Sequence, residues 1–182
     1  QERENPFCLY LSYKAVHHEW RPPPDLVDLY DDVKPDLPKE ADPWITTTRG
    51  GIYFGTFGKL EHHYMNYARC VVALDRQIGR VLDALRDGGR ADDTLVVFTS
   101  DHGEAFLEHG TFGHGHVPYD ELLHIPLLVK YPHNRHGGEV ISHEVQILDI
   151  FAEILDQAGI SQPKNIQGQP FRNSSHGLMA SV

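Results

Sequence analysis

The sequence has few cysteines, an excess of negative charge and no long hydrophobic run. Cys8 and Cys70 are the two cysteines among 182 residues; each lies in an apolar run, which favours buried free thiols over a disulfide framework. No apolar run approaches the ~20 residues of a membrane-spanning helix. The formal net charge of −10 argues against nucleic acid or an anionic membrane surface as a main partner. It leaves room for a small anionic substrate, because a site can be locally positive.

A recognisable targeting segment is also missing. No signal peptide is visible, and the chain starts at Gln1 rather than Met and enters an apolar segment almost at once. We expect a piece of a longer protein, so periplasmic, extracellular and cytoplasmic locations all stay open. The length of 182 residues suits one α/β domain, and 40% hydrophobic and 23% charged residues are ordinary for a soluble globular protein.

Alternating strand-like and helical patterns predict an α/β fold. The strand-like runs are rich in aliphatic or aromatic residues and short, whereas the helical runs place apolar residues three and four positions apart. We expect a mostly parallel central sheet flanked by helices, because the run at 94–99 is apolar without alternation. The expected strands are Phe7–Tyr13, Thr94–Thr99 and Ile125–Tyr131, and the expected long helices are Leu60–Asp87 and Val145–Ala158.

Asp101 and His102 follow the buried strand at 94–99 directly. In open α/β sheets ligands bind beyond the carboxyl ends of the strands. An aspartate and a histidine side by side offer a hard oxygen and an imidazole nitrogen, and Gly103 lets the backbone turn beneath them. The pair is a candidate half of a metal site; taken alone, it favours the simpler interpretation of a strand followed by a polar turn.

Histidine is the unusual residue, with 13 copies. Several lie between His102 and His116 in a glycine-rich loop, and two more, His17 and His18, precede three consecutive prolines. Solvated or structural histidines account for most of such a set. A cluster beside an acidic turn is more typical of a functional site, since imidazole titrates near neutral pH and ligates metals.

The order of these motifs resembles the sulfatase family of the alkaline phosphatase superfamily. The specific part is 92–132, which contains Asp-His-Gly-Glu, a His-Gly loop, Tyr-Asp-Glu-Leu-Leu-His and Ile-Pro-Leu-Leu-Val in sequence. The resemblance covers nearly all of residues 6–170. It implies a partial alkaline-phosphatase-like sandwich occupying 1–182 as a single partial domain, with 171–182 as an irregular tail.

The resemblance also implies roles for particular residues. Asp101 and His102 match the late pair of metal ligands in the family, and His114 matches the position from which a Lys or His contacts the sulfate. His17 matches the histidine that contacts the ester oxygen and protonates the leaving group. Other histidines match less firmly and are candidates for the surrounding layer: His18, His109 and His116.

Two elements of the family have no counterpart in this chain. Sulfatases carry an early pair of aspartates and a Cys-x-Pro-x-Arg or Ser-x-Pro-x-Arg signature whose Cys or Ser becomes formylglycine. Cys8 is followed by Leu-Tyr-Leu and Cys70 by Val-Val-Ala, so neither fits. The chain is similar to a middle-to-late fragment of a sulfatase catalytic domain. The resemblance places formylglycine upstream of Gln1, in a missing N-terminal part of the same domain.

The implied function is a sulfuric ester hydrolase acting on a small-molecule or carbohydrate sulfate ester. Its implied cofactor is one divalent cation, with Ca²⁺ ahead of Mg²⁺ and Mn²⁺, because an oxygen-rich ligand set suits these ions. Without its nucleophile we expect the fragment to be inactive alone. Three alternatives stay open: a phosphodiesterase or phosphonate monoester hydrolase of the same superfamily, a non-catalytic His-rich metal-binding module, and an inactive relative whose sheet serves as a scaffold.

Overall fold

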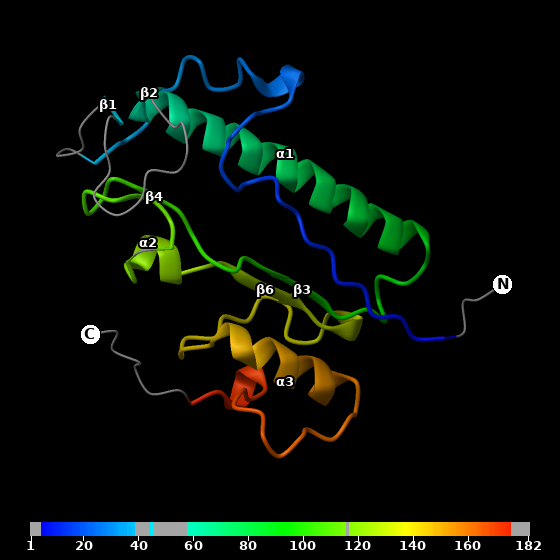
Figure 1. Ribbon diagram of the computed structural model, residues 1–182. Helices are drawn as coiled ribbons and strands as arrows, with labels where there is room; N and C mark the ends of the chain where they lie inside the picture. Colours follow the sequence, from blue (N-terminus) through cyan, green and yellow to red (C-terminus); the bar gives the residue numbers. More distant parts are fainter. Residues whose placement is uncertain (1–4, 39–43, 46–57, 116, 176–182) are drawn as a thin grey trace. The chain divides into compact units, whose positions relative to one another are not determined.

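The computed structural model describes residues 5–38, 44–45, 58–115 and 117–175 (Figure 1). Its secondary structure alternates short strands with helices of very different length. The strands are β1 (Trp44–Ile45), β2 (Gly58–Lys59), β3 (Val96–Thr99), β4 (Ala105–Phe106), β5 (Phe112–Gly113) and β6 (Leu127–Lys130). The helices are α1 (Leu60–Asp87), α2 (Asp120–Leu123) and α3 (Ile147–Gln157), with 3-10 turns at η1 (Pro24–Leu26), η2 (Pro132–Asn134) and η3 (Phe171–Asn173).

The chain divides into two compact units, each described by itself. The first contains Gln1–Ala84 and Glu104–His116, and the second contains Leu85–Gly103 and Val117–Val182. The expected single partial domain over 1–182 stays a prediction. None of the helices in the described part of the chain has the length and hydrophobicity that crossing a bilayer requires.

In the first unit, residues 25–31 lie beside α1 and contact it through two arginines (Figure 1). Arg69 of α1 is buried and donates to the backbone oxygen of Leu29 at 2.7 Å and to Asp31 Oδ1 at 2.5 Å. Further along the same helix, Arg76 pairs with Asp25 at 2.6 Å on the surface. Because Arg69 directs its charge and donors to a carboxylate and a carbonyl, its burial is compensated.

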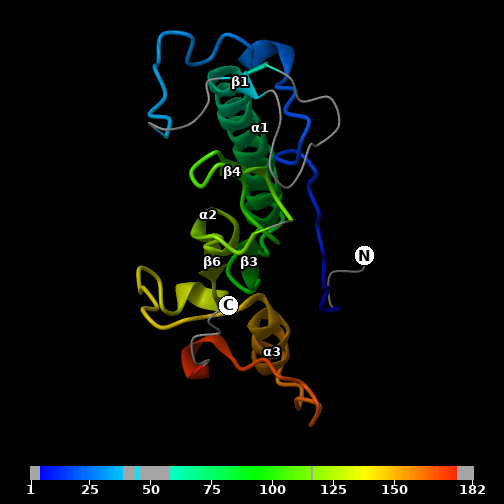
Figure 2. The ribbon, with the colours of Figure 1, turned by 60° about the vertical axis from the view of Figure 1, so that its left-hand side comes forward.

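The second unit contains the predicted strand 94–99 and its only pairing among the described residues. β3 pairs with β6 in antiparallel register, from Val96 opposite Lys130 to Thr99 opposite Leu127, and the two lie side by side in Figures 1 and 2. Lys130 reaches past the start of β3 and donates to the backbone oxygen of Ala91. The ladder and this lysine fix the position of the strand that leads to Asp101.

The C-terminal half of the second unit is organised by a buried carboxylate. Asp149, in the first turn of α3, is fully buried and accepts hydrogen bonds from the backbone N–H groups of Gln146 and Gln169 at 2.9 and 2.8 Å. Its Oδ2 also accepts from the Ser174 hydroxyl at 3.0 Å. These bonds draw the irregular segment after α3 back onto the helix, as the position of η3 beside α3 illustrates (Figure 2).

The predicted α/β class is confirmed, but the predicted mostly parallel sheet is not. In the residues that the structure describes, all three strand pairs are antiparallel, and each sheet has two strands. The four residues of β3 are half-buried, and their partner among the described residues is the antiparallel β6, so the apolar run does not mark a central parallel strand here. The helices are confirmed: α1 has the predicted bounds, and α3 lies within the predicted 145–158.

The predicted strand at 7–13 is wrong. The segment is extended but belongs to no strand, and it exposes large side chains such as Leu9 and Tyr10. Cys8 in this segment is also exposed rather than buried, whereas Cys70 on α1 is buried as expected. An aromatic and aliphatic run favours a strand only when a partner supplies the ladder of backbone hydrogen bonds, and the described residues supply none to this run.

Glycine is required at position 103 because the backbone of α2 lies very close to it, and not because of an unusual backbone angle. A Cβ added there would lie 1.9 Å from the backbone oxygen of Glu121, and the Gly103 N–H donates to the Leu122 oxygen at 2.9 Å. The backbone therefore packs against α2 so tightly that only glycine fits. Gly79, in the middle of α1, is the opposite case, because a Cβ added there would meet no atom within 4 Å.

These two glycines form a matched pair of alanine substitutions. We expect Gly103→Ala to lower the free energy of unfolding by several kcal/mol, since backbone must move to relieve the overlap. Gly79→Ala is expected to raise it by about 0.5–1 kcal/mol, because alanine stabilises a helix interior. Urea unfolding of both variants measures the effect. Equal stability of the two variants would contradict the close packing of Gly103 on α2.

Candidate active site

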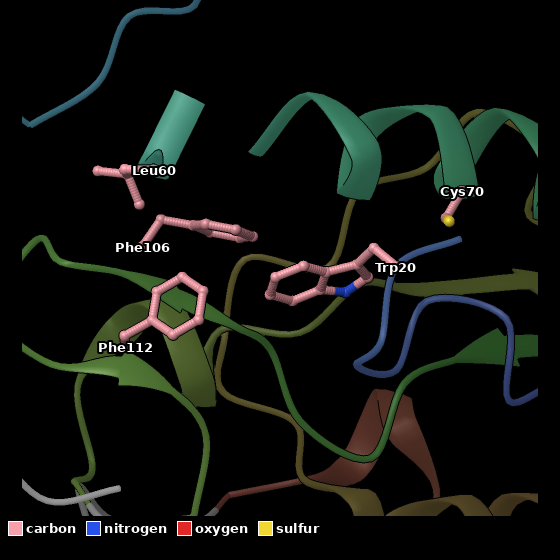
Figure 3. Packing of buried hydrophobic residues seen from close by; sticks show 5 residues of the cluster. All are labelled: Trp20, Leu60, Cys70, Phe106 and Phe112. Atoms are coloured by element: carbon pink, nitrogen blue, oxygen red, sulfur yellow. The ribbon is translucent and has the colours of Figure 1, made fainter. Parts of the chain in front are cut away.

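Trp20 anchors the loop that carries His17 and His18 to the core of the first unit (Figure 3). Its indole is 5% exposed, packs against the rings of Phe106 and Phe112 at centroid distances of 5.3 and 5.7 Å, and donates from Nε1 to the backbone oxygen of Val16 at 3.1 Å. The buried cluster also includes Leu60 and Cys70 of α1. Because the indole bonds back to its own loop, burying Trp20 also fixes the backbone on either side of His17.

The glycine-rich loop folds into a hairpin formed by β4 and β5. Ala105 pairs with Gly113 and Phe106 with Phe112, so the next position in the register places Glu104 opposite His114. Side chains of cross-strand neighbours lie on the same face of a sheet, within reach of one another. The two phenylalanines lie two residues inside Glu104 and His114 along their strands, so all four side chains share the face that packs on Trp20.

The structure brings His17 and His114 together. Their ring centroids lie 4.9 Å apart with an edge-to-face angle of 70°. His114 Nδ1 contacts Glu104 Oε1 at 2.9 Å, with the two side chains only 10% and 5% exposed. His17 Nδ1 contacts the backbone oxygen of His18 at 2.6 Å, while the His17 residue itself is exposed. The first unit thus holds a buried carboxylate–imidazole pair in ring contact with a second, solvent-facing imidazole.

Such an arrangement suits hydrogen-bond donation and proton transfer to an anion. In both rings Nδ1 faces an oxygen acceptor, which favours a hydrogen on Nδ1 and turns Nε2 to the opposite side of each ring. When a ring is doubly protonated, Nε2 carries a hydrogen as well, so one imidazolium can donate to an anionic oxygen while the other gives a proton to a leaving group. Tyr67 on α1 faces the same carboxylate: burial, and then the negative charge of Glu104, raise the pKa of Tyr67.

Glu104 is the residue that sequence reasoning does not find. It is the fourth residue of Asp-His-Gly-Glu, but no pattern along the chain links it with His114 ten residues later. The signal that finds it is the hairpin register, which requires knowing that the loop turns at Gly110, with φ +69°, and pairs Ala105 with Gly113. Among the other candidates, His18 adjoins His17 and His109 is exposed; His116 lies outside the described residues.

Asp101 and His102 belong to the second unit, at the carboxyl end of β3. The His102 N–H donates to Asp101 Oδ1 at 3.1 Å, and His102 Nδ1 contacts the Gly103 backbone oxygen at 2.8 Å. His102 Nε2 lies 3.9 Å from Asp101 Oδ1, and Asp101 is largely exposed. Ser100 donates its hydroxyl to the His102 oxygen at 2.6 Å and so holds the turn.

This geometry fits two ligands of one divalent cation. Contact of Nδ1 with a backbone oxygen is the usual support for a histidine that ligates through Nε2, and here Nε2 is on the Asp101 side. A carboxylate oxygen beside it supplies the hard ligand that Ca²⁺ and Mg²⁺ prefer. Within the described ranges, no three His, Cys, Asp or Glu side chains converge on a metal-sized site. Asp101 and His102 therefore fit as part of a ligand set.

The Sulfatase family model matches residues 1–160 of the chain. Among curated relatives, the arylsulfatase of Clostridium perfringens is 30% identical over 181 residues, covering 92% of this chain and 37% of that protein. The chain spans 20% to 37% of the lengths of the first curated relatives that it matches.

Two solved structures share the fold at higher identity over a shorter stretch. One, determined in complex with its substrate D-glucosamine-2-N,6-O-disulfate, superposes with a TM-score of 0.57 at 34% identity, covering 60% of this chain and 22% of that chain. The phosphonate monoester hydrolase from Silicibacter pomeroyi superposes with a TM-score of 0.57 at 31% identity, covering 62% of this chain and 22% of that chain.

The local charges around His18 give a testable pH dependence. Burial lowers the pKa of His18 below its ordinary 6.5; Glu19 opposes this effect, and His17 and His114 add to it. We expect Glu19→Gln to lower the pKa of His18 further and His114→Gln to raise it, as measured by following the imidazole Cε1–H in an NMR titration. A His18 pKa that ignores both substitutions would contradict the proximity of these side chains.

The same shift predicts the sign of a stability change. A histidine whose pKa is lower in the folded state is protonated more readily in the unfolded state, so its protonation disfavours folding as the pH falls below 6.5. We therefore expect His18→Gln to reduce the loss of stability between about pH 7 and pH 5, measured by urea unfolding at each pH. A larger loss in the variant would be the opposite of this expectation.

Proposed function

The chain belongs to the sulfatase family, and on this premise we propose that it supplies part of the catalytic domain of a hydrolase that cleaves sulfate esters. The observation that carries the proposal is the contact between His17 and His114, with Glu104 buried behind His114. A sulfate ester is anionic, and its cleavage needs charge stabilisation on the sulfate and a proton for the departing alcohol. Two adjacent imidazoles of different exposure meet these two needs.

In the proposed mechanism His114 holds the sulfate and His17 releases the alcohol. His114, oriented by Glu104 and doubly protonated in this step, donates from Nε2 to a sulfate oxygen and stabilises the charge that grows there in the transition state. His17 gives a proton to the ester oxygen as the S–O bond breaks, which typically contributes about 10²–10⁴-fold to the rate. Its exposed position lets it recover that proton from water.

Asp101 and His102 are the proposed metal ligands within this chain. We assign them to one divalent cation, Ca²⁺ ahead of Mg²⁺ and Mn²⁺, because one ligand is a carboxylate and the pair resembles the late metal ligands of the family. Such an ion, when bound, neutralises sulfate charge and orients one sulfate oxygen. Asp101 supplies the anionic ligand, and His102, held through Nδ1 by the Gly103 oxygen, supplies Nε2.

The proposal assigns no nucleophile to this chain. Neither cysteine begins a Cys-x-Pro-x-Arg signature, and Cys70 is buried in the aromatic cluster. A formylglycine nucleophile and the other metal ligands are proposed to come from an N-terminal part of the same domain, in line with the 20% to 37% of relatives' length that the chain spans. The mostly parallel sheet of an alkaline-phosphatase-like sandwich belongs to the same proposal.

The proposed substrate is a sulfated carbohydrate. Its support is the similar structure that was determined with its substrate D-glucosamine-2-N,6-O-disulfate. A second candidate is a phosphonate monoester, which the similarity to the Silicibacter pomeroyi enzyme favours. Rates of the full-length protein on glucosamine 6-sulfate and on a phenyl phosphonate monoester would decide between them; a higher kcat/KM for the phosphonate would replace the sulfatase assignment.

The metal assignment is tested in the full-length protein that carries this chain. We expect Asp101→Ala to lower kcat/KM for 4-nitrophenyl sulfate by about 100-fold or more, because a bound cation contributes several kcal/mol of charge stabilisation. Excess Ca²⁺ should recover part of the loss. Asp93→Ala is the matched control: Asp93 lies near the opposite end of β3, is exposed and pairs with His133 at 3.4 Å. Equal activity of both variants would exclude Asp101 as a ligand.

If His17 is the general acid, the rate loss caused by its removal should depend on the leaving group of the ester. A general acid matters most when the departing oxygen is a poor leaving group, so His17→Ala is expected to slow an alkyl sulfate by about 10²–10⁴-fold and 4-nitrophenyl sulfate far less. Steady-state rates on both esters, with wild-type protein as the reference, measure the difference. Equal losses on the two esters would mean that His17 does not protonate the leaving group.

The isolated chain is expected to show no sulfatase turnover, because the proposed nucleophile lies outside it. Incubation of residues 1–182 with 4-nitrophenyl sulfate and Ca²⁺, followed by the absorbance of released 4-nitrophenolate, measures this. Turnover that His17→Ala abolishes would place a nucleophile within the chain and overturn this part of the proposal.

A further inference from the structure

Glu104 is a buried acid in contact with His114, and no chemical step of the proposed mechanism has been assigned to it. Its side chain is 5% exposed, and its Oε1 lies 2.9 Å from His114 Nδ1. Burying a carboxylate is unfavourable unless hydrogen bonds or an opposite charge compensate it. Glu104 is buried next to the β4–β5 hairpin, opposite His114. Its burial therefore suggests a role that depends on its contact with that histidine.

The hairpin defines where Glu104 and His114 can be. Because Ala105 pairs with Gly113, Glu104 and His114 occupy facing positions. On the other side of that pair, Phe106 and Phe112 are buried against Trp20. The strands are therefore held by the aromatic cluster and not by the acid–imidazole contact. Removing the acid should leave the backbone of the hairpin in place while freeing the imidazole ring.

Side chains from two further segments lie near the pair of Glu104 and His114. His17 lies in ring contact with His114, His18 is close enough for its pKa to be lowered by both imidazoles, and Tyr67 faces Glu104 from α1. The pKa of Tyr67 is raised first by burial and then by the Glu104 charge. Glu104 therefore contacts His114 of its own hairpin and is near enough to Tyr67 of α1 to affect its pKa.

We propose that Glu104 is a positioning residue for His114: its Oε1 accepts the hydrogen on Nδ1, fixes the rotation of the ring and turns Nε2 toward the substrate anion. This inference rests on the proposed role of His114 in holding the sulfate. The ring of a histidine turns about both of its side-chain torsions, and an unheld ring would present Nε2 correctly for only part of the time. The carboxylate removes that freedom before the substrate binds.

Three substitutions of Glu104 distinguish the effect of the position of its acceptor oxygen from the effect of its negative charge. Glu104→Gln keeps the length and an oxygen acceptor but loses the charge. Glu104→Asp keeps the charge but withdraws it by roughly 1.5 Å, one carbon–carbon bond. Glu104→Ala removes both. Glu61→Gln, at an exposed acid in the first turn of α1, controls for the loss of a negative charge in the same unit.

In the full-length protein, the inference predicts a defined order of kcat/KM for 4-nitrophenyl sulfate. Glu104→Ala should lose about 10- to 100-fold, the loss typical when a carboxylate that orients a metal-bound histidine is removed. Glu104→Gln should retain more activity than Glu104→Asp, and Glu61→Gln should match the wild type. Activity of the alanine variant within about threefold of wild type, or an aspartate variant at least as active as the glutamine variant, overturns the proposal.

A measurement on the ring itself separates this inference from the proposed function. In ¹⁵N NMR spectra, wild type and Glu104→Gln should show the His114 Nδ1–H protected from exchange, and Glu104→Ala should lose that signal while near-ultraviolet circular dichroism of the aromatic cluster persists. A protected Nδ1–H in a protein without sulfatase turnover would refute the proposed function alone. Turnover with an Nδ1–H signal that Glu104→Ala leaves unchanged would refute the positioning role alone.

Discussion

Burial of Trp20 is the constraint on which the first unit depends. The indole packs against Phe106 and Phe112 of the hairpin and belongs to one cluster with Leu60 and Cys70 of α1. Three segments distant in the sequence therefore share one apolar contact, and full burial of a large aromatic ring supplies a stabilisation of a few kcal/mol. Since Nε1 must also find an acceptor, the ring bonds to the Val16 oxygen, which ties the loop of His17 to the same point.

The polar contacts near this cluster can persist because the apolar contacts hold the backbone. A buried Glu–His pair contributes little net stability, since desolvation of the carboxylate opposes the attraction. The pair of Glu104 and His114 is therefore better understood as an arrangement for function than as a reason for folding. The same division recurs in the second unit, where the β3–β6 ladder fixes the strand while Asp101 and His102 lie in the turn beyond it.

Periodicity predicted α1 and α3 well, but it said less about which of their faces would be covered. Of the apolar residues at helical spacing on α1, Val71 and Leu82 are 41% and 43% exposed, whereas the charged Arg69 is buried. Helical spacing follows from local backbone geometry, whereas burial needs a partner surface. Arg69 is buried because Asp31 and the Leu29 oxygen approach it, and neither lies within the helix. The extended run at 7–13 failed as a strand for the same reason.

Residue types in local order were enough to indicate the family, the bounds of the long helix and the candidate site residues, because each of these depends on short stretches of the chain. His17, His114, Asp101 and His102 were all named from such order. The folded chain was needed to show that the His17 and His114 rings are in contact, that β3 pairs with an antiparallel strand, and that Glu104 contacts His114 Nδ1. Contacts of this kind depend on hairpin register and on the packing of distant segments around Trp20, and neither is encoded at any single position in the chain.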